Sequence, residues 1–233
     1  MAAPLPRPRT RPGATRRRQG ATGLTVGSTR VQGVPAATDH EVRKATAVDV
    51  PALGRVLARA FLDDPVACWS CPSDRRRRRA NERFFGARTR QLLDQEQVYT
   101  TADASGAALW ALPDRWRMRP RDLLGLAPLV PTWGPRLPRV LRGLSQVEHA
   151  HPETPPHFHL AVLGTDPSRQ GEGIGSALLG PVLELCDRDH VPAYLESSKE
   201  SNIAFYARHG FRVTDELRLP KGPRVWPMWR APR

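Results

Sequence analysis

Residues 41–95 show hydrophobic spacing typical of a short strand followed by helices. Residues 41–45 predict a strand. Apolar residues then recur at helical spacing at Val50, Leu53, Val56, Leu57, Ala60 and Phe61. Asp49 is the expected N-cap of this helix, and Pro51 is tolerated in its first turn. A second helix is predicted over residues 75–95, with the consecutive arginines Arg75–Arg79 forming a solvated first turn.

A hairpin follows, and after it a proline-rich region. Residues 98–101 and 107–112 predict two strands joined by the turn at residues 103–106. Residues 113–156 contain nine prolines and two apolar runs, 123–130 and 137–144. We expect short helices and loops there.

The last third of the chain has the most regular pattern. Strands are predicted over residues 157–165, 193–196, 211–217 and 225–229, and helices over residues 173–189 and 201–209. Gly210 stands just past the second helix, where glycine commonly ends one. A strand, a helix and a strand in that order predict parallel pairing with a right-handed crossover. The expected fold class is therefore mixed α/β.

The N-terminal segment lacks any such period. Residues 1–40 contain seven arginines and no acidic residue before Asp39. We expect a disordered basic tail at 1–40 and one folded domain at 41–233. A nucleic-acid or membrane-surface arm, and a start codon assigned too far upstream, are alternative interpretations of the tail.

Composition narrows the class of protein. The chain has 233 residues, 24 prolines and a formal net charge of +13 that comes almost entirely from arginine. Such a charge fits either a GC-rich coding sequence or attraction to anions. No apolar run approaches a membrane span and no secretory signal is expected. The three cysteines cannot form a disulfide framework, which favours a reduced, cytoplasmic setting.

The segment Arg169–Ser176 carries the strongest chemical signal. It lies between a predicted strand and a predicted helix and contains Gly171, Gly173 and Gly175. Unpaired backbone N–H groups and the positive end of the helix dipole favour a phosphate there, and Arg169 adds positive charge. The loop lacks the third glycine of a dinucleotide-binding fingerprint and the Gly-Lys-Ser/Thr of a P-loop.

The spacing of Gln170, Gly173 and Gly175 instead resembles the pyrophosphate loop of GNAT acetyltransferases, which bind coenzyme A. The resemblance extends over residues 41–233 and is closest to the puromycin N-acetyltransferase family. It is carried by residues 109–113, 158–164, 191–198, 202–206, 209–211 and 220–224. Pro181, inside a predicted helix, also matches that family.

The resemblance implies the GNAT fold, a mixed sheet splayed open near its middle and flanked by helices. It implies that acetyl-CoA is the co-substrate. Val162, Leu163 and Gly164 would contact its pantetheine arm, with Gly164 near a bulge. The pyrophosphate would lie on Arg169, Gln170, Gly171, Gly173, Gly175 and Ser176, and Asn202 would contact the arm from the next helix.

Two residues are candidates for the proton transfers that acetylation of an amine requires. Tyr206 matches the position of the family's general acid, and Glu196 at a strand end is a candidate base. Tyr206 as a packing residue and Glu196 as a buried structural residue are the alternatives.

Substrate contacts are expected from Trp110, Phe61, Phe158 and His159, with Phe85 a further aromatic candidate. His159 replaces an aromatic residue of the compared family, which puts puromycin itself in question. The expected activity is N-acetylation of a small-molecule primary amine, such as an aminonucleoside antibiotic in a resistance step. The alternatives are a protein N-acetyltransferase and an acetyl-CoA sensor. No DNA-reading helix is recognisable, which argues against a nucleic-acid partner.

No metal is expected. Cys68 and Cys71 have zinc-ligand spacing, but no second pair accompanies them. His149, His151, His157 and His159 are close in sequence, with two expected in a loop and two on one face of a strand.

Overall fold

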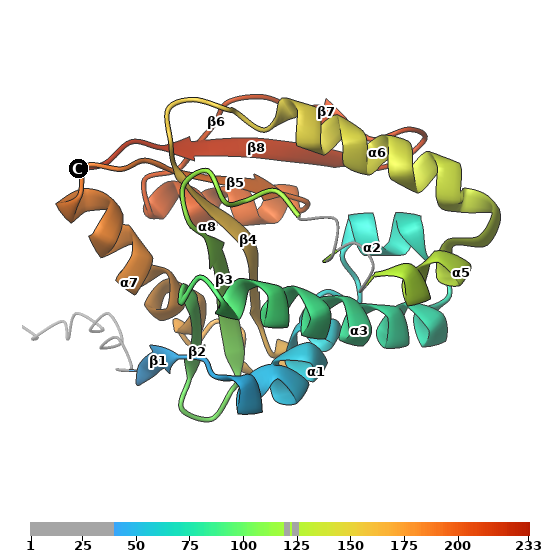
Figure 1. The fold of residues 1–233 in the computed structure, drawn as a ribbon, viewed down its shortest axis with the longest axis horizontal. Helices are drawn as coiled ribbons and strands as arrows, with labels where there is room; N and C mark the ends of the chain where they lie inside the picture. Colours follow the sequence, from blue (N-terminus) through green and yellow to red (C-terminus); the bar gives the residue numbers. More distant parts are fainter. Residues whose placement is uncertain (1–39, 119–121, 123–125) are drawn as a thin grey trace, which may run out of the picture. The chain divides into compact units, whose positions relative to one another are not determined.

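The computed structural model describes residues 40–118, 122 and 126–233. Within this part of the chain a mixed sheet has the strand order β1-β2-β3-β4-β5-β8-β6, and β7 pairs with β8 beside that path (Figure 1). The strands are β1 (Val42–Lys44), β2 (Val98–Thr101), β3 (Gly106–Ala111), β4 (Phe158–Thr165), β5 (Ala193–Ser197), β6 (Arg212–Val213), β7 (Leu217–Arg218) and β8 (Arg224–Arg230). Among the strands of the described residues, only β4 and β5 pair in parallel; the other pairs are antiparallel.

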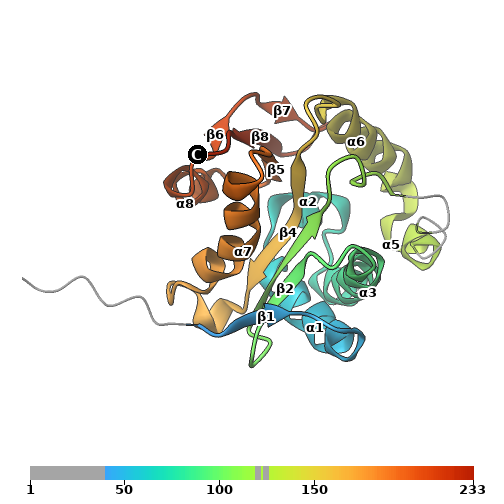
Figure 2. The ribbon, with the colours of Figure 1, turned by 60° about the vertical axis from the view of Figure 1, so that its left-hand side comes forward.

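Helices cover both faces of the sheet. They are α1 (Val50–Ala60), α2 (Pro65–Ser70), α3 (Asp74–Leu93), α5 (Val130–Trp133), α6 (Leu137–Ala150), α7 (Ile174–Arg188) and α8 (Ile203–Arg208). Short 3-10 turns occupy Ala47–Asp49, Ala127–Leu129, Gly134–Arg136, Pro167–Arg169 and Glu200–Asn202. As Figure 2 shows, α7 lies on one side of the central strands, and α1 and α3 lie on the other.

The alternation of side chains along β3 explains this layering. Ala108 and Trp110 join one core cluster with residues of α7, whereas Leu109 and its odd-numbered neighbours join a second cluster with residues of α1 and α3. Because successive side chains of a strand point to opposite faces, one short apolar strand anchors both helical layers.

A bulge breaks the register between β3 and β4. Leu109 pairs with Val162 and Trp110 pairs with Leu160, which leaves Ala161 as the extra residue. Leu160 therefore packs on the α7 side and Val162 on the α1 side, although they are two residues apart. The bulge lies at Ala161, so the expectation of a bulge near Gly164 is corrected by three residues.

The sheet is open at its middle. Parallel pairing joins Phe158–Leu160 of β4 to Ala193–Leu195 of β5 and stops there, although both strands continue. The helix α7 makes the crossover between these two parallel strands, as expected from the sequence. The mixed α/β class and the splayed sheet are confirmed.

Two local expectations are wrong, and a third, Asp49 as the N-cap of α1, holds for its position but not for its side chain. Residues 211–217 do not form one strand: β6 and β7 pair with separate parts of β8, and Thr214 between them donates its N–H to the Pro227 carbonyl. Asp49 does not cap α1 with its side chain, because its carboxylate accepts hydrogen bonds from Arg43 and Thr46. Arg77 is not solvated: it is 5% exposed and donates to the carbonyls of Leu62 and Cys71.

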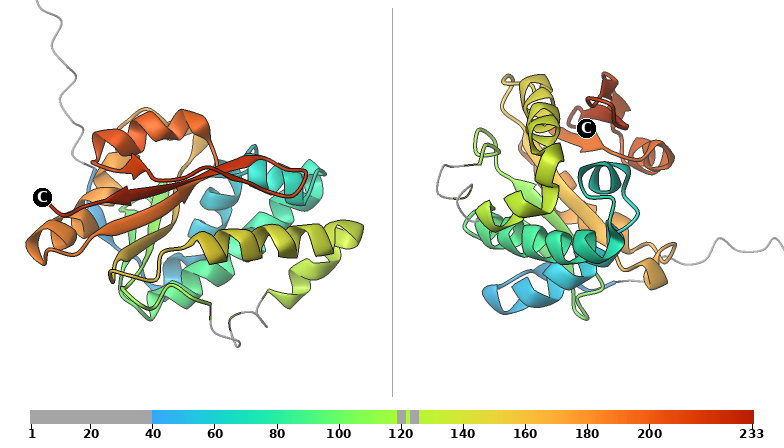
Figure 3. Two further views of the ribbon diagram at one scale, coloured as in Figure 1. Left: turned by 90° about the horizontal axis from the view of Figure 1, so that it is seen from above. Right: turned by 90° about the vertical axis from the view of Figure 1, so that its right-hand side faces the viewer.

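The proline-rich region contains more helix than the sequence predicts. Figure 3 shows the 14-residue helix α6 alongside α5. Trp69 of α2 connects α6 to the β7–β8 hairpin, because its indole N–H donates to the Pro220 carbonyl and Arg139 donates to the Trp69 carbonyl. These contacts connect the start of α6 to the β7–β8 hairpin.

Of the basic tail predicted at residues 1–40, all but His40 lies outside the described residues. Among the residues that are described, we find no helix with the length and apolar character that a bilayer crossing needs.

Candidate active site

A cleft of about 520 Å³ opens where β4 and β5 diverge. Its walls are the second half of β4, the end of β5, the loop before α7, and α8. It is lined by all ten residues that the sequence associates with coenzyme A: Val162, Leu163, Gly164, Arg169, Gln170, Gly171, Gly173, Gly175, Ser176 and Asn202. Glu196, Tyr206 and Phe61 also line it. Residues distant in sequence thus meet in one cavity.

The backbone of the glycine loop takes the left-handed conformation at two of its glycines. Gly171 and Gly173 have φ angles of +87° and +88°, in the left-handed region that favours glycine. Gly173 is the N-cap of α7, and a Cβ atom built on either glycine would meet no atom within 4 Å. The first turn of the 15-residue helix α7 therefore borders open space in the cleft.

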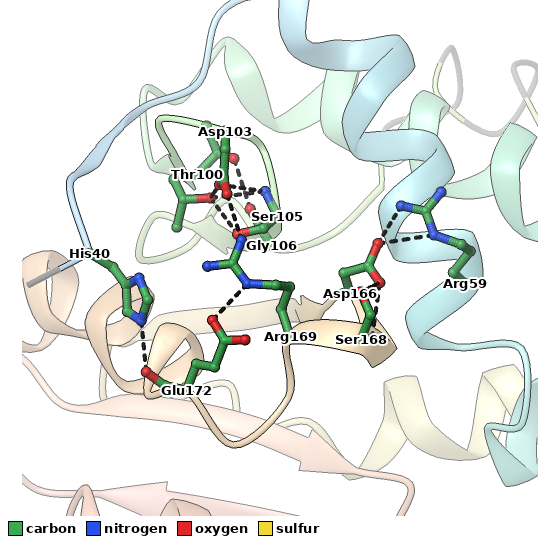
Figure 4. A network of polar contacts seen from close by, with 11 residues as sticks. His40, Arg59, Thr100, Asp103, Ser105, Gly106, Asp166, Ser168, Arg169 and Glu172 are labelled. Carbon is green, nitrogen blue, oxygen red and sulfur yellow. Dashed lines mark hydrogen bonds and ion pairs between the residues drawn. The ribbon is translucent and has the colours of Figure 1, made fainter. Parts of the chain in front are cut away.

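Ion pairs hold the ends of this loop (Figure 4). Arg169 donates to Glu172 and, at 2.8 Å, to Asp103 on the β2–β3 turn. Asp166 accepts from Arg59 of α1 and from the Ser168 hydroxyl. Arg169 is thus paired with two carboxylates, and the β2–β3 turn and α1 contact the loop from two sides.

Glu196 lies among histidines. Its Oε2 atom is 2.9 Å from Nε2 of His159 on β4, and its Oε1 atom is 3.4 Å from Nδ1 of His151, which follows α6. Burial raises the pKa of the Glu196 carboxyl, but the two imidazoles outweigh that effect and lower it. The group is a carboxylate at neutral pH.

Tyr206 is buried in the second half of α8 and lines the cleft. Its ring makes edge contacts with Phe205 and Phe211. Burial raises the pKa of the Tyr206 phenol above its ordinary value. The phenol therefore keeps its proton at neutral pH.

The expected substrate contacts divide into two groups. Phe61 lines the cleft and packs on Phe85, with ring centroids 4.8 Å apart. Trp110 is 0% exposed and lies with Phe158 in the core cluster under α7, so their expected place at the substrate is corrected. His159 contacts Glu196 instead of lining the cleft.

Comparison with known proteins accounts for this arrangement. Residues 147–231 match the model of an acetyltransferase (GNAT) domain. The chain carries a GNAT acetyltransferase domain. An uncharacterized N-acetyltransferase of Schizosaccharomyces pombe is 23% identical over 208 residues, covering 80% of each chain.

Solved structures agree on the fold. A structure described as histone acetyltransferase HPA2 and related acetyltransferase, from Corynebacterium glutamicum, is 25% identical, with a TM-score of 0.58 over 83% of this chain and 97% of that one. The polyamine N-acetyltransferase of Drosophila melanogaster is 16% identical, with a TM-score of 0.56 over 83% of this chain and 100% of that one. The protein is thus an N-acetyltransferase with the GNAT fold. Enzymes of the GNAT family generally use acetyl-CoA.

Sequence reasoning missed Asp64, which also lines the cleft of this GNAT domain. Its carboxylate accepts the backbone N–H groups of Val66 and Ala67, capping α2, and accepts the hydroxyl of Ser198 beyond β5. Aspartate followed by proline is a helix-start signal. That signal at Asp64-Pro65 could have predicted α2.

The histidines are closer together than their sequence positions suggest. Within the described residues, ligand-type atoms of His151, His159 and Glu196 lie within 4.8 Å of one another, an arrangement that could hold a metal ion. The expectation of two histidines in a loop and two on a strand face is wrong, because His149 belongs to α6 and His157 precedes β4. Cys68, Cys71 and Cys186 are free thiols.

Proposed function

We propose that this protein transfers the acetyl group of acetyl-CoA to the primary amine of a small molecule. The observation that carries the proposal is the shared cleft, in which the glycine loop, the open half of β4, Glu196 and Tyr206 meet. We take residues 41–233 as the catalytic domain and residues 1–40 as a basic tail outside it. Three free cysteines support a reduced, cytoplasmic setting.

In this proposal acetyl-CoA lies along β4. Beyond Leu160 the edge of β4 that faces β5 is released from the ladder, which leaves backbone groups of Val162 and Leu163 for the pantetheine arm and the acetyl carbonyl. The N-terminus of α7 and the N–H groups of Gly171 and Gly173 would hold the pyrophosphate.

Glu196 and Tyr206 take opposite roles in proton transfer. An ammonium substrate must lose a proton before its nitrogen can attack, and Glu196 is a carboxylate at the wall of the cleft. The departing thiolate of coenzyme A must gain a proton, and the raised pKa of Tyr206 keeps its phenol protonated until then. The carboxylates of Glu196 and Asp64 can pair with a cationic amine, whereas Arg169, Lys199 and Arg208 on the same cleft suit the phosphates of the co-substrate.

Features of the cleft and the named relatives support three substrate classes. Phe61 offers one aromatic face, which supports an aryl-bearing amine such as an aminonucleoside antibiotic. The carboxylates support a polyamine, the substrate class in the name of the Drosophila relative. A protein amine is the third class, named for the Corynebacterium relative.

Release of free coenzyme A thiol from acetyl-CoA tests the proposal against a panel of puromycin, an aminoglycoside, agmatine, an arylalkylamine and a lysine-containing peptide. A reaction without amine measures the background from the partly exposed Cys68. Turnover with a small amine is expected. Turnover only with the peptide would favour a protein acetyltransferase, and acetyl-CoA binding with no turnover would favour a sensor.

A further inference from the structure

Two histidines beside Glu196 have the composition and spacing of a metal site. We propose that His151, His159 and Glu196 together bind one divalent transition-metal ion, with zinc as the ion to test. The acetyl transfer proposed above uses no such ion, so this is a separate binding function at the wall of the cleft. Spacing along the chain did not predict it, because the fold brings its ligands together.

Three separate parts of the fold supply the ligands. His151 follows α6, His159 lies on β4, and Glu196 lies on β5. Ligand-type atoms of all three residues lie within 4.8 Å of one another. Because β4 and β5 pair next to these residues, the sheet itself fixes the distance between two of the ligands.

The distances suit a small ion. Nε2 of His159 is 2.9 Å from Oε2 of Glu196, and Nδ1 of His151 is 3.4 Å from Oε1 of the same carboxylate. Two ligand atoms bound tetrahedrally to zinc at about 2.0–2.1 Å are about 3.3–3.4 Å apart. The carboxylate therefore already stands near the separation from each imidazole that shared coordination requires, and the two imidazoles need only approach each other.

A second layer of contacts holds the ring of His151 in place. Its Nε2 atom is 2.9 Å from Nε2 of His157, and Nδ1 of His157 is 2.8 Å from the Pro155 carbonyl oxygen. A metal-bound imidazole commonly donates its other N–H to such a partner, which fixes the orientation of the ring. Trp116 also stacks on His151 with ring centroids 3.6 Å apart. Nδ1 of His151 is thus the nitrogen directed at Glu196.

The surroundings give an ion a way in and a fourth coordination position. His151 and His159 are buried, whereas Glu196 lines the open cleft, so an ion would enter from the cleft and keep a water molecule on that side. Arg88 of α3, a positive charge near Glu196, also interacts with the carboxylate of Asp122.

The ligand set selects the class of ion. Two imidazoles and one carboxylate suit zinc and neighbouring transition metals, whereas magnesium and calcium prefer oxygen ligands. Three protein ligands with one open position are also typical of accessible zinc sites. We therefore expect zinc and cobalt(II) to bind and magnesium to bind far more weakly.

Zinc at this site should stop acetyl transfer. The ion would hold the Glu196 carboxylate, which the proposed reaction needs to take the proton of the substrate amine. This consequence rests on the proposed function, whereas the binding of the ion does not. We expect zinc to inhibit and a chelator to restore the activity.

The full-length wild-type protein, without an affinity tag and stripped by a chelator, gives the first test. Isothermal titration calorimetry should find one zinc ion per chain, and zinc should raise Tm because it binds the folded state. Cobalt(II) should show the visible bands of a tetrahedral site without the near-ultraviolet band of a thiolate ligand. Absence of zinc binding, or a thiolate band that disappears in Cys68→Ala, would overturn the site.

Substitution of His159 gives the second test. His159→Phe keeps a planar ring but removes one ligand, so zinc affinity should fall at least about 100-fold, more than is typical for loss of an outer partner. His149→Gln is the matched control, because His149 is exposed on α6 and its contacts are with Ser145 of the same helix. Zinc affinity should not change in this control. Wild-type affinity in His159→Phe would show that the ligand set is wrong.

Activity separates a failure of the metal site from a failure of the proposed function. If zinc binds with the predicted dependence on His159 and acetyl transfer continues at full rate, the role of Glu196 as the base is wrong and the metal site stands. If zinc inhibits the wild type and His159→Phe equally, it acts elsewhere and the metal site is wrong.

Discussion

Gly173 offers the sharpest test of the cleft, because a substitution there should affect two separate quantities. Its backbone conformation predicts an effect on stability, and its open surroundings predict an effect on acetyl-CoA binding. At φ +88° an L-residue is strained, so Gly173→Ala should lower the free energy of unfolding by about 1–2 kcal/mol. For a domain of this size each kcal/mol shifts Tm by about 2–4 °C, which predicts a fall of about 2–8 °C. No atom within 4 Å opposes the new methyl group, so the strain is the whole cost to the unliganded protein.

Binding should change for a different reason. The open space beside Gly173 belongs to the cleft, so a methyl group there would keep a pyrophosphate from the N-terminus of α7. We expect acetyl-CoA affinity to fall at least about tenfold, equivalent to about 1.4 kcal/mol, measured by isothermal titration calorimetry. Chemical denaturation measures the stability change.

Gly86→Ala is the matched control. Gly86 lies within α3 with open space around it and away from the cleft, so this change should stabilise the protein by about 0.5–1 kcal/mol and leave affinity unchanged. If Gly173→Ala is as stable as the wild type, the inference that an L-residue is strained at this position is wrong. Lowered stability with unchanged acetyl-CoA affinity would refute the assignment of the loop to the pyrophosphate.

Three further predictions concern ionisable groups. Tyr206→Phe should lower kcat about 10²- to 10⁴-fold while steady-state binding of acetyl-CoA changes little; an unchanged kcat would remove Tyr206 from the acid role. Burial lowers the pKa of His151 and His157, so below about pH 6.5 the unfolded state binds more protons than the folded state and stability should fall; denaturation at pH 5.5 and 7.5 checks this, and His157→Gln should weaken the dependence. Burial raises the pKa of the Cys186 thiol to about 12, so iodoacetamide should label Cys68 but not Cys186 in the native protein, and mass spectrometry that found Cys186 labelled would contradict its burial.

The sequence predicted features whose physical causes are local. Gly210 was recognisable as the end of a helix because few residues other than glycine tolerate the left-handed conformation found there. The hairpin at 98–111 and the long helix α7 followed from hydrophobic period, and the glycine loop followed from its place between a strand and a helix. The resemblance to GNAT enzymes added the residues of one cavity, which no local rule brings together.

Tertiary contacts decided the rest. Residues 211–217 became two short strands because β8 was available to pair with each part separately. Arg77 looked like one of five equivalent arginines, and only the approach of the Leu62 and Cys71 carbonyls makes it a buried donor. Trp110 and Phe158 were expected at a pocket because they are aromatic, but the bulge and α7 placed both in the core.

The histidines show most clearly which features the sequence determines and which only the tertiary structure determines. The sequence placed His151, His157 and His159 near one another along the chain but gave no reason to connect them with Glu196, some forty residues later. Parallel pairing of β4 with β5 sets His159 beside that carboxylate, and the end of α6 sets His151 on its other oxygen. Residue types that donate and accept protons are visible in the sequence, whereas the direction of each hydrogen bond depends on which atoms the fold brings within reach.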